Sequence, residues 1–178
     1  MKTFSLSPSE AYVEHRIFDT TPIHLRWATR SEKQKLLNFV RYNRLIDIFL
    51  RVSAYSLQNH LRTTVPNMGQ IETDELYVAV RNTGQQFVIP VQAKGGTDKI
   101  GIVQVQQDIA LCREKFPDLT PRPVAVQFKS GATGDVVVMF ELVAVADEIK
   151  VVDEKHYRLV RASEIGGDDL RAMAATDN

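Results

Sequence analysis

The spacing of apolar side chains changes from a helical to a strand period along the chain. From Ser31 to about Leu57 there is no Pro or Gly, and Leu, Phe, Arg, Lys and Gln predominate. This composition predicts one long helix, with Ser31 or Thr29 as its N-cap. Apolar side chains surround much of the helix axis, so we expect the helix to be substantially buried.

Beyond this helix the apolar residues recur at every second position, which is typical of strands. Three strands are predicted, at 61–65, 71–80 and 86–93. The turn sequence at 81–84 predicts that the second and third strands form a hairpin. Pro90 removes a backbone donor from the third strand, so that strand needs a bulge or an unpaired side there.

A second helix is predicted from about Lys99 to Phe116, with Thr97 or Asp98 as its N-cap. Its apolar stripe, at steps of three and four, comprises Ile102, Val105, Ile109, Cys112 and Phe116. Pro117 ends or kinks this helix. Further strands are predicted at 124–128, 135–145 and 155–160. The order of helix, three strands, helix and strands predicts an α/β fold with a central mixed sheet flanked by helices.

The composition is that of an ordinary globular domain. The 178 residues are 44% hydrophobic and 25% charged, with 9 Gly and 7 Pro, which excludes collagen-like, low-complexity and wholly disordered chains. The one cysteine, Cys112, cannot form an intramolecular disulfide, and no Cys/His pair has zinc-ligand spacing. No apolar run approaches the roughly 18 residues of a membrane span, so we expect a soluble, cytoplasmic protein without a membrane partner.

The formal net charge is zero, with 22 Lys and Arg against 22 Asp and Glu, but the charges are unevenly spread. Residues 1–62 carry ten basic and five acidic side chains, whereas residues 151–178 carry four basic and six acidic ones. The balanced total is therefore compatible with a local basic surface that contacts phosphates. We divide the chain into an N-terminal extension at 1–30, a main domain at 31–165, and an acidic tail at 166–178 that is frayed or a short helix.

Polar side chains occur at the ends of two neighbouring predicted strands. Because side chains alternate along a strand, Glu72 and Asp74 share one face of the second strand. By the same rule, Gln92 and Lys94 share one face of the third strand. The hairpin brings the start of the second strand beside the end of the third. An acid, an amide oxygen and an ammonium group are therefore expected to converge.

This combination suits the hydrolysis of a phosphodiester. Such a reaction needs oxygen ligands for a hard divalent cation, a water that loses its proton, and positive charge to offset the phosphoryl oxygens. Asp74 and the side-chain oxygen of Gln92 can hold the cation, and the cation with Lys94 can meet the other two needs. The alternatives are an ordinary ion pair between Asp74 and Lys94, and acidic residues that protect an edge strand from aggregation.

The arrangement resembles the PD-(D/E)XK nuclease superfamily. An acid on the second strand, a hairpin, an apolar strand ending in Gln-x-Lys, a Gly-containing loop and a Gln-bearing helix succeed one another within residues 31–145, in the αβββαβ order of that family's core. Asp74 matches the metal-binding acid and Lys94 matches the lysine. Gln92 matches the (D/E) position, which is Gln in Mrr-like and some restriction enzymes. The resemblance implies a restriction-endonuclease-like core.

The resemblance also implies a metal site. Because Gln92 is neutral, metal binding needs a further acid, and Glu72 fits better than Glu75, which alternates to the opposite face unless a bulge shifts the register. We therefore expect Asp74, Gln92 and Glu72 to bind Mg²⁺, with Mn²⁺ as the alternative. These three residues and Lys94 form the expected catalytic site.

Three more positions match residues found in parts of the family. Gln104 and Gln107 match polar residues that some subfamilies direct at the active site, and Glu32 matches an auxiliary acid of the first helix. The resemblance implies an Mg²⁺-dependent DNA endonuclease of the restriction or defence kind, acting as a homodimer because one such site cuts one strand. The alternatives are a structure-selective resolvase or repair nuclease, and a nuclease-like domain that binds DNA or a protein without cutting.

Overall fold

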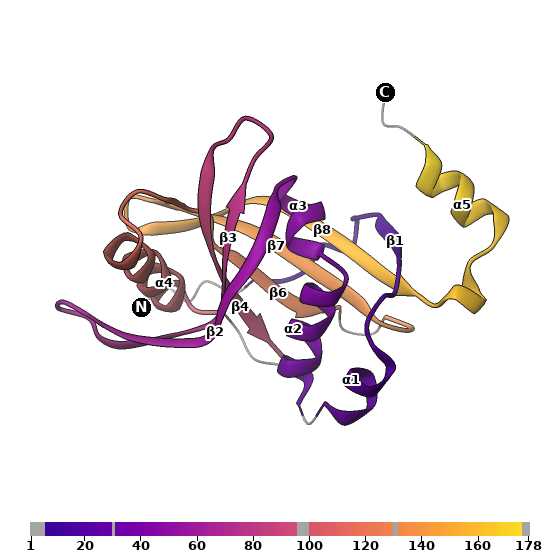
Figure 1. Ribbon diagram of the computed structural model, residues 1–178, viewed down its shortest axis with the longest axis horizontal. Coiled ribbons are helices and arrows are strands. Elements are labelled where there is room, and N and C mark those ends of the chain that lie inside the picture. The colour runs from indigo at the N-terminus through magenta and orange to yellow at the C-terminus, as the bar shows by residue number, and fades with distance from the viewer. Residues whose placement is uncertain (1–5, 30, 96–99, 130–131, 176–178) are drawn as a thin grey trace.

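A computed structural model describes residues 6–29, 31–95, 100–129 and 132–175. Within these ranges an eight-stranded mixed sheet forms the centre of the molecule, in the order β1-β8-β7-β6-β4-β3-β2, with β5 paired to β4 outside this path (Figure 1). The strands are β1 (Glu14–Phe18), β2 (Ser53–Val65), β3 (Gly69–Val80), β4 (Gln86–Lys94), β5 (Thr120–Pro121), β6 (Val124–Phe128), β7 (Val136–Val145) and β8 (Glu148–Val160). The predicted α/β class with a mixed sheet flanked by helices is confirmed.

Helices lie on both faces of this sheet. The helices of the described ranges are α1 (Ile23–Ala28), α2 (Glu32–Tyr42), α3 (Leu45–Leu50), α4 (Ile102–Lys115), the short 3₁₀ helix η1 (Ala162–Glu164) and α5 (Gly167–Ala174), of which α5 projects away from the sheet (Figure 1). The helices α2 and α3 pack on one face, and α4 covers the other (Figure 1). The connection from β4 through α4 to β6 makes these two strands parallel, whereas β2, β3 and β4 form an antiparallel meander. None of the helices in the described ranges is long and apolar enough to cross a membrane.

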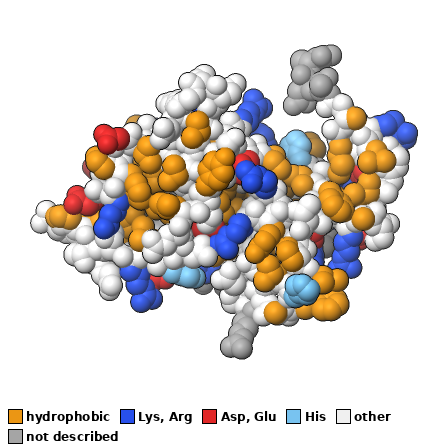
Figure 2. Space-filling view, viewed as in Figure 1, with side chains coloured by type: hydrophobic (Ala, Val, Ile, Leu, Met, Phe, Trp, Pro, Cys, Tyr) orange, Lys and Arg blue, Asp and Glu red, His pale blue; other side chains and the backbone are white. Residues whose placement is uncertain are grey.

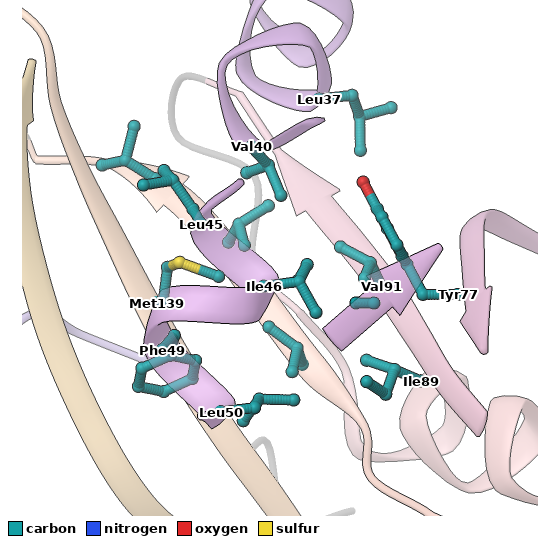
Figure 3. Packing of buried hydrophobic residues seen from close by; sticks show 14 of the residues in the cluster. Leu37, Val40, Leu45, Ile46, Phe49, Leu50, Tyr77, Ile89, Val91 and Met139 are labelled. Carbon is teal, nitrogen blue, oxygen red and sulfur yellow. The ribbon is translucent and has the colours of Figure 1, made fainter. Parts of the chain in front are cut away.

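The main core lies between the α2–α3 pair and the sheet. Figure 3 shows side chains of both helices, among them Leu37 and Ile46, directed at Ile89, Val91 and Met139 of the strands. Residues of β4 alternate strictly, so that its odd-numbered side chains join this core while Val88 packs under α4. Because β4 is buried on both faces, its polar residues require partners within the protein.

The prediction of a single helix from Ser31 to about Leu57 is wrong for the C-terminal half of that range. The chain forms α2 and α3 instead, and it enters β2 at Ser53. Arg44 and Arg51 both adopt left-handed backbone conformations, with φ of 52° and 55°, which interrupt and then end the helical path. The predicted N-cap is confirmed, since Ser31 accepts a hydrogen bond from the Gln34 amide at 3.1 Å.

Strand boundaries also differ from their predicted positions. The strands predicted at 61–65 and 155–160 are the ends of the longer β2 and β8, because β3 and β7 offer long partners that extend the pairing. The predicted hairpin of β3 and β4 is confirmed. Pro90 pairs with Leu76 of β3 and lies between the residues of β4 that pair with β5 and with β6, as its missing N–H requires.

The second predicted helix begins later than expected. The helix α4 starts at Ile102 with Gly101 as its N-cap, and the predicted caps Thr97 and Asp98 lie outside the described residues. At the two ends of the chain, β1 lies within the segment 1–30 and pairs in parallel with β8 as an edge strand. The tail contains the short helix α5, as predicted.

The break between α2 and α3 depends on a buried amide. The side chain of Asn43 donates to the hydroxyl of Thr21 at 2.9 Å and to the carbonyl of Phe39 at 3.0 Å, and it accepts the Thr20 amide at 2.8 Å. These bonds tie the segment before α1 to the end of α2. They hold the chain at the point where helix propensity alone predicts continuation.

We expect Asn43→Ala to lower the free energy of unfolding by about 1–3 kcal/mol, because it leaves the buried partners of this amide unsatisfied. Urea denaturation measures the change. The matched control is Asn82→Ala, which truncates an exposed asparagine in the turn between β3 and β4. Equal midpoints for the two variants would show that Asn43 does not stabilise the break.

Candidate functional site

The strands β3 and β4 stop pairing before the end of β4. Their pairing runs from Val80 and Gln86 to Glu75 and Val91. Beyond this point the carboxylate of Asp74 replaces a backbone acceptor of β3, since its Oδ2 accepts the N–H of Ala93 at 2.9 Å. The residues beyond Val91 pair only with β6 among the described strands.

Asp74 is almost fully buried, with 2% of its surface exposed. Its Oδ1 forms an ion pair with Nζ of Lys33, in the first turn of α2. The following residue, Glu75, also bonds to α2, since its Oε1 accepts from Nε of Arg41 at 2.9 Å. Neighbouring side chains of a regular strand point to opposite faces, so β3 departs from alternation where its ladder with β4 ends.

On the α4 side, buried polar groups form a continuous network. Gln92 is 2% exposed and donates through Nε2 to Oδ2 of Asp108 at 2.8 Å. Its Oε1 accepts from Nε2 of Gln104 at 2.9 Å. The hydroxyl of Thr73 donates to Oδ1 of Asp108 at 2.7 Å. Both oxygens of Asp108 are thereby engaged, and the amide of Gln92 is held in one orientation.

Burial raises the pKa of the Asp108 carboxyl to about 7, and the nearby charge of Asp74 acts in the same direction. The hydrogen bonds from Thr73 and Gln92 and the charge of Lys94 oppose this rise. The pKa of Asp108 therefore lies where small changes in local charge alter its protonation.

The end of β4 lies close to the start of α2. Lys94 is half-buried at this end. The following residue, Gly95, approaches α2 so closely that an added Cβ would lie 3.0 Å from the Cβ of Glu32 and 3.4 Å from the Lys33 amide nitrogen. Any larger side chain at Gly95 would therefore crowd the first turn of α2. The approach sets the first turn of α2, with Glu32 and Lys33, beside the chain that carries Lys94.

We refer to six residues where the ladder opens as the strand-end cluster: Thr73, Gln92, Gln104 and Asp108, which are joined by hydrogen bonds, Asp74, which bonds to the backbone of Ala93, and Lys94, the residue after Ala93. Three of the four residues expected to be catalytic, Asp74, Gln92 and Lys94, belong to it. Asp74 is ion-paired with Lys33, not with Lys94 as the simple ion-pair alternative supposed.

The other candidates have different surroundings. Glu72 is exposed on the β2–β3 hairpin, where it pairs with Arg62 at 2.8 Å and lies 3.5 Å from Nδ1 of His60, so the structure does not bring it to the cluster. Glu75 is buried against Arg41 and accepts a hydrogen bond from Ser56. Of the two helix glutamines, Gln104 joins the cluster, and Gln107 is half-buried on α4.

Sequence reasoning missed Asp108 and Lys33. Asp108 had a detectable signal, because it lies three residues after Val105 and four before Cys112 and so occupies the apolar stripe of α4. A carboxyl at a core position requires partners, and Thr73 and Gln92 supply them. Lys33 had no comparable signal, since a lysine in the first turn of a helix is ordinary.

The oxygen atoms of the cluster suit Mg²⁺ better than a softer metal. Mg²⁺ is commonly bound through one or two protein oxygens, with waters and substrate phosphate completing the shell. Asp74 offers a carboxylate and Gln92 offers the second lone pair of Oε1. Lys33 competes for Asp74, but its side chain is 40% exposed and can swing into solvent. Within the described ranges, no group of three or more His, Cys, Asp or Glu side chains could hold a metal ion.

Comparison of the chain with family models, with curated proteins and with solved structures finds no match. The chemistry of the strand-end cluster is therefore the basis for assigning a function. That chemistry combines a buried carboxylate, an oriented amide oxygen and a lysine at an opening in a sheet.

The raised pKa of Asp108 predicts a pH dependence of stability. Between about pH 4 and about pH 7 the folded chain retains a proton on Asp108 that the unfolded chain has released, so this group lowers stability as the pH rises through that range. Asp108→Asn removes the titration, and its amide can still accept from Gln92 and donate to Thr73. The unfolding free energy of the variant relative to wild type should therefore increase from about pH 5 to about pH 7.5.

Urea denaturation at the two pH values measures this difference. Asp118→Asn, at an exposed position after α4, is the matched control and should show no such trend. Parallel pH profiles for wild type and Asp108→Asn would mean that Asp108 titrates at its ordinary pKa in the folded protein.

Proposed function

We propose that the chain is a divalent-metal-dependent deoxyribonuclease, an endonuclease of the restriction or defence kind that hydrolyses phosphodiester bonds at the strand-end cluster. The observation that carries the proposal is the bond of Asp74 to the backbone of Ala93, which lies between Gln92 and Lys94 where the ladder of β3 and β4 ends. These are the acid, the Gln and the Lys by which the sequence resembles the PD-(D/E)XK superfamily.

The order of elements supports the same proposal. From α2 to β6 the chain runs through helices, three antiparallel strands, a helix and a strand parallel to the third, which corresponds to αβββαβ. We infer a restriction-endonuclease-like core from this order. The strands β7, β8 and β1 extend it beyond β6.

Each residue of the cluster has a distinct part in the proposed reaction. A bound Mg²⁺ or Mn²⁺ would supply Lewis acidity and lower the pKa of a bound water. Asp74 and Oε1 of Gln92 would hold the metal. Nζ of Lys94 would donate hydrogen bonds to a non-bridging phosphoryl oxygen and offset the negative charge that grows there. Gln104 fixes the amide of Gln92, so its oxygen needs no reorientation when metal and substrate arrive.

A second candidate has an observation in its favour. Both oxygens of Asp74 already have partners, Lys33 and the Ala93 amide, and Oε1 of Gln92 has Gln104. A site satisfied by its own side chains suits a nuclease-like domain that binds DNA or a protein without cutting. Metal binding separates the two candidates, since only the nuclease requires Lys33 to release Asp74.

The proposed activity is tested by incubating supercoiled plasmid with the protein, with and without Mg²⁺. We expect metal-dependent nicking or linearisation, and we expect Lys94→Ala to reduce the rate by at least about 100-fold, because the charge that stabilises the transition state is lost. Lys115→Ala, on the exposed end of α4, removes the same charge elsewhere and should cleave as wild type does. Equal melting temperatures would exclude misfolding as the cause.

Full activity of Lys94→Ala would overturn the proposed site, and the absence of cleavage by wild type with Mg²⁺ or Mn²⁺ would overturn the proposed activity. Branched and linear duplexes assayed side by side separate a structure-selective nuclease from one that cuts ordinary duplex. Cutting of both strands requires two sites, so we expect the active species to be a homodimer.

Metal binding has its own test in thermal unfolding. Mg²⁺ or Mn²⁺ at about 100 times its dissociation constant stabilises the folded state by about 2.7 kcal/mol, and the melting temperature of wild type should rise by several degrees. Asp74→Asn should abolish the rise, because it removes the carboxylate ligand, whereas Asp118→Asn should retain it. The absence of a rise in wild type would favour the domain that binds without cutting.

A further inference from the structure

Three adjoining hollows follow α2, α3 and β2 and continue across the end of the sheet. The first has a volume of about 210 Å³ and is lined in part by Arg41 and Arg44. The second, of about 530 Å³, shares Asp47 and Tyr55 with the first. The third, of about 900 Å³, shares Arg51, Arg81 and Asn82 with the second. The shared lining residues show that the three hollows adjoin one another, and we refer to them together as the groove.

One arginine connects the groove to the neighbourhood of the strand-end cluster. Arg41 lines its first hollow and also bonds to Glu75, the residue that follows Asp74 in β3. Its third hollow extends from Arg81, next to the β3–β4 turn, to Lys155 and Tyr157 of β8. Since a strand rises about 3.4 Å per residue, the chain from Glu75 of β3 to Arg81, which borders the first two hollows, spans about 20 Å. Consecutive phosphates of one DNA strand are about 3.4 Å apart along the helix axis, so this part of the groove matches roughly six nucleotides.

Basic side chains recur along this groove. Arg44 is paired with Asp47, Arg122 with Glu141 at 2.7 Å, and Lys155 with Asp153 at 3.1 Å. Arg51 and Arg81 differ from these, because neither forms an ion pair with any residue that the structure describes. Lys and Arg side chains also lie over α2 and α3 on the face seen in Figure 2. The excess positive charge of residues 1–62 thus contributes to this side of the molecule.

These two arginines, which have no acidic partner among the described residues, occupy defined positions in the groove. Arg51 ends α3 with a left-handed backbone conformation, φ 55°, and lines both larger hollows. The guanidinium of Arg81 stacks on Phe87, 5.1 Å from the ring centre, and that of Arg122 lies 5.0 Å from the same ring. Nη1 of Arg81 also donates to Oε1 of Gln85 at 3.4 Å, and stacking holds its planar guanidinium in one orientation in which the remaining N–H groups can bind phosphate oxygens.

We propose that this groove binds the phosphodiester backbone of duplex DNA, with Arg51 and Arg81 as phosphate contacts at a distance from the strand-end cluster. The inference rests on the proposed nuclease function, to which it adds the path of the substrate. The open, cationic form of the groove suits a polyanion that extends over its length. A small nucleotide would occupy only one of the three hollows.

The test measures the binding of fluorescently labelled duplex DNA by anisotropy, in buffer with EDTA so that no cleavage occurs. The double variant Arg51→Gln with Arg81→Gln should bind several-fold more weakly. Each phosphate contact contributes about −0.9 to the slope of log K against log salt concentration, so the slope should lose about two units of its magnitude. The double variant Arg51→Lys with Arg81→Lys keeps both charges and should retain most of the slope.

The matched control is Arg113→Gln with Lys115→Gln, which removes two exposed charges from α4, on the opposite face of the sheet. This control should bind DNA with the affinity and slope of wild type. Melting curves of all variants show whether each one folds. An unchanged slope in the Arg51 and Arg81 variant would overturn the inference, as would wild type that shows no salt-dependent binding of duplex.

Two further measurements distinguish failure of the proposed DNA groove from failure of the proposed nuclease activity. Displacement of the labelled duplex by a mononucleotide at a similar concentration would overturn the assignment to a DNA backbone. Binding that depends on Arg51 and Arg81, without plasmid cleavage by wild type, would support the groove and reject the nuclease. Metal-dependent cleavage with unchanged binding in the double variant would reject the groove alone.

Discussion

The carboxylate of Asp74 accepts the N–H of Ala93 at the point where backbone pairing of β3 and β4 ends. A buried amide without a partner costs about 1–3 kcal/mol, so the strands can separate there only because a side chain supplies the missing acceptor. Their separation gives Lys33 access to Asp74 from α2 and brings Gln92 under α4. The cluster therefore depends on one hydrogen bond in which the side-chain oxygen of Asp74 takes the place of a backbone carbonyl oxygen.

The network on the α4 side meets the requirement that buried polar groups be satisfied. Asp108 occupies a core position of an otherwise apolar stripe, and it is tolerated because Thr73 and Gln92 both donate to it. The same bonds fix the amide of Gln92, which cannot rotate without leaving Asp108 or Gln104 unpaired. A group that stabilises the packing of α4 on the sheet thus also orients a side chain of the proposed site.

The neutral total charge conceals two regions of opposite character. Acidic groups meet at the end of the β3–β4 ladder, where a cation is proposed to bind, and arginines follow the groove that leads away from it. Most of these arginines are paired with acids, and this pairing limits repulsion among them in the absence of a polyanion. Arg51 and Arg81 have no acidic partner among the described residues, and they are the arginines that we propose contact phosphate. A substrate that carries phosphates and requires a metal would make use of both regions.

Local patterns in the sequence determined the strands, the hairpin of β3 and β4, and hence the meeting of Asp74, Gln92 and Lys94, because a period of two and turn residues act over a few positions. They did not determine the end of the first long helix, where Asn43 bonds to residues before α1, or the position of Glu72 on the exposed hairpin. The partners Lys33 and Asp108 also emerged only from the fold. These contacts join segments far apart in the chain, and their energies depend on burial, which only the tertiary structure decides.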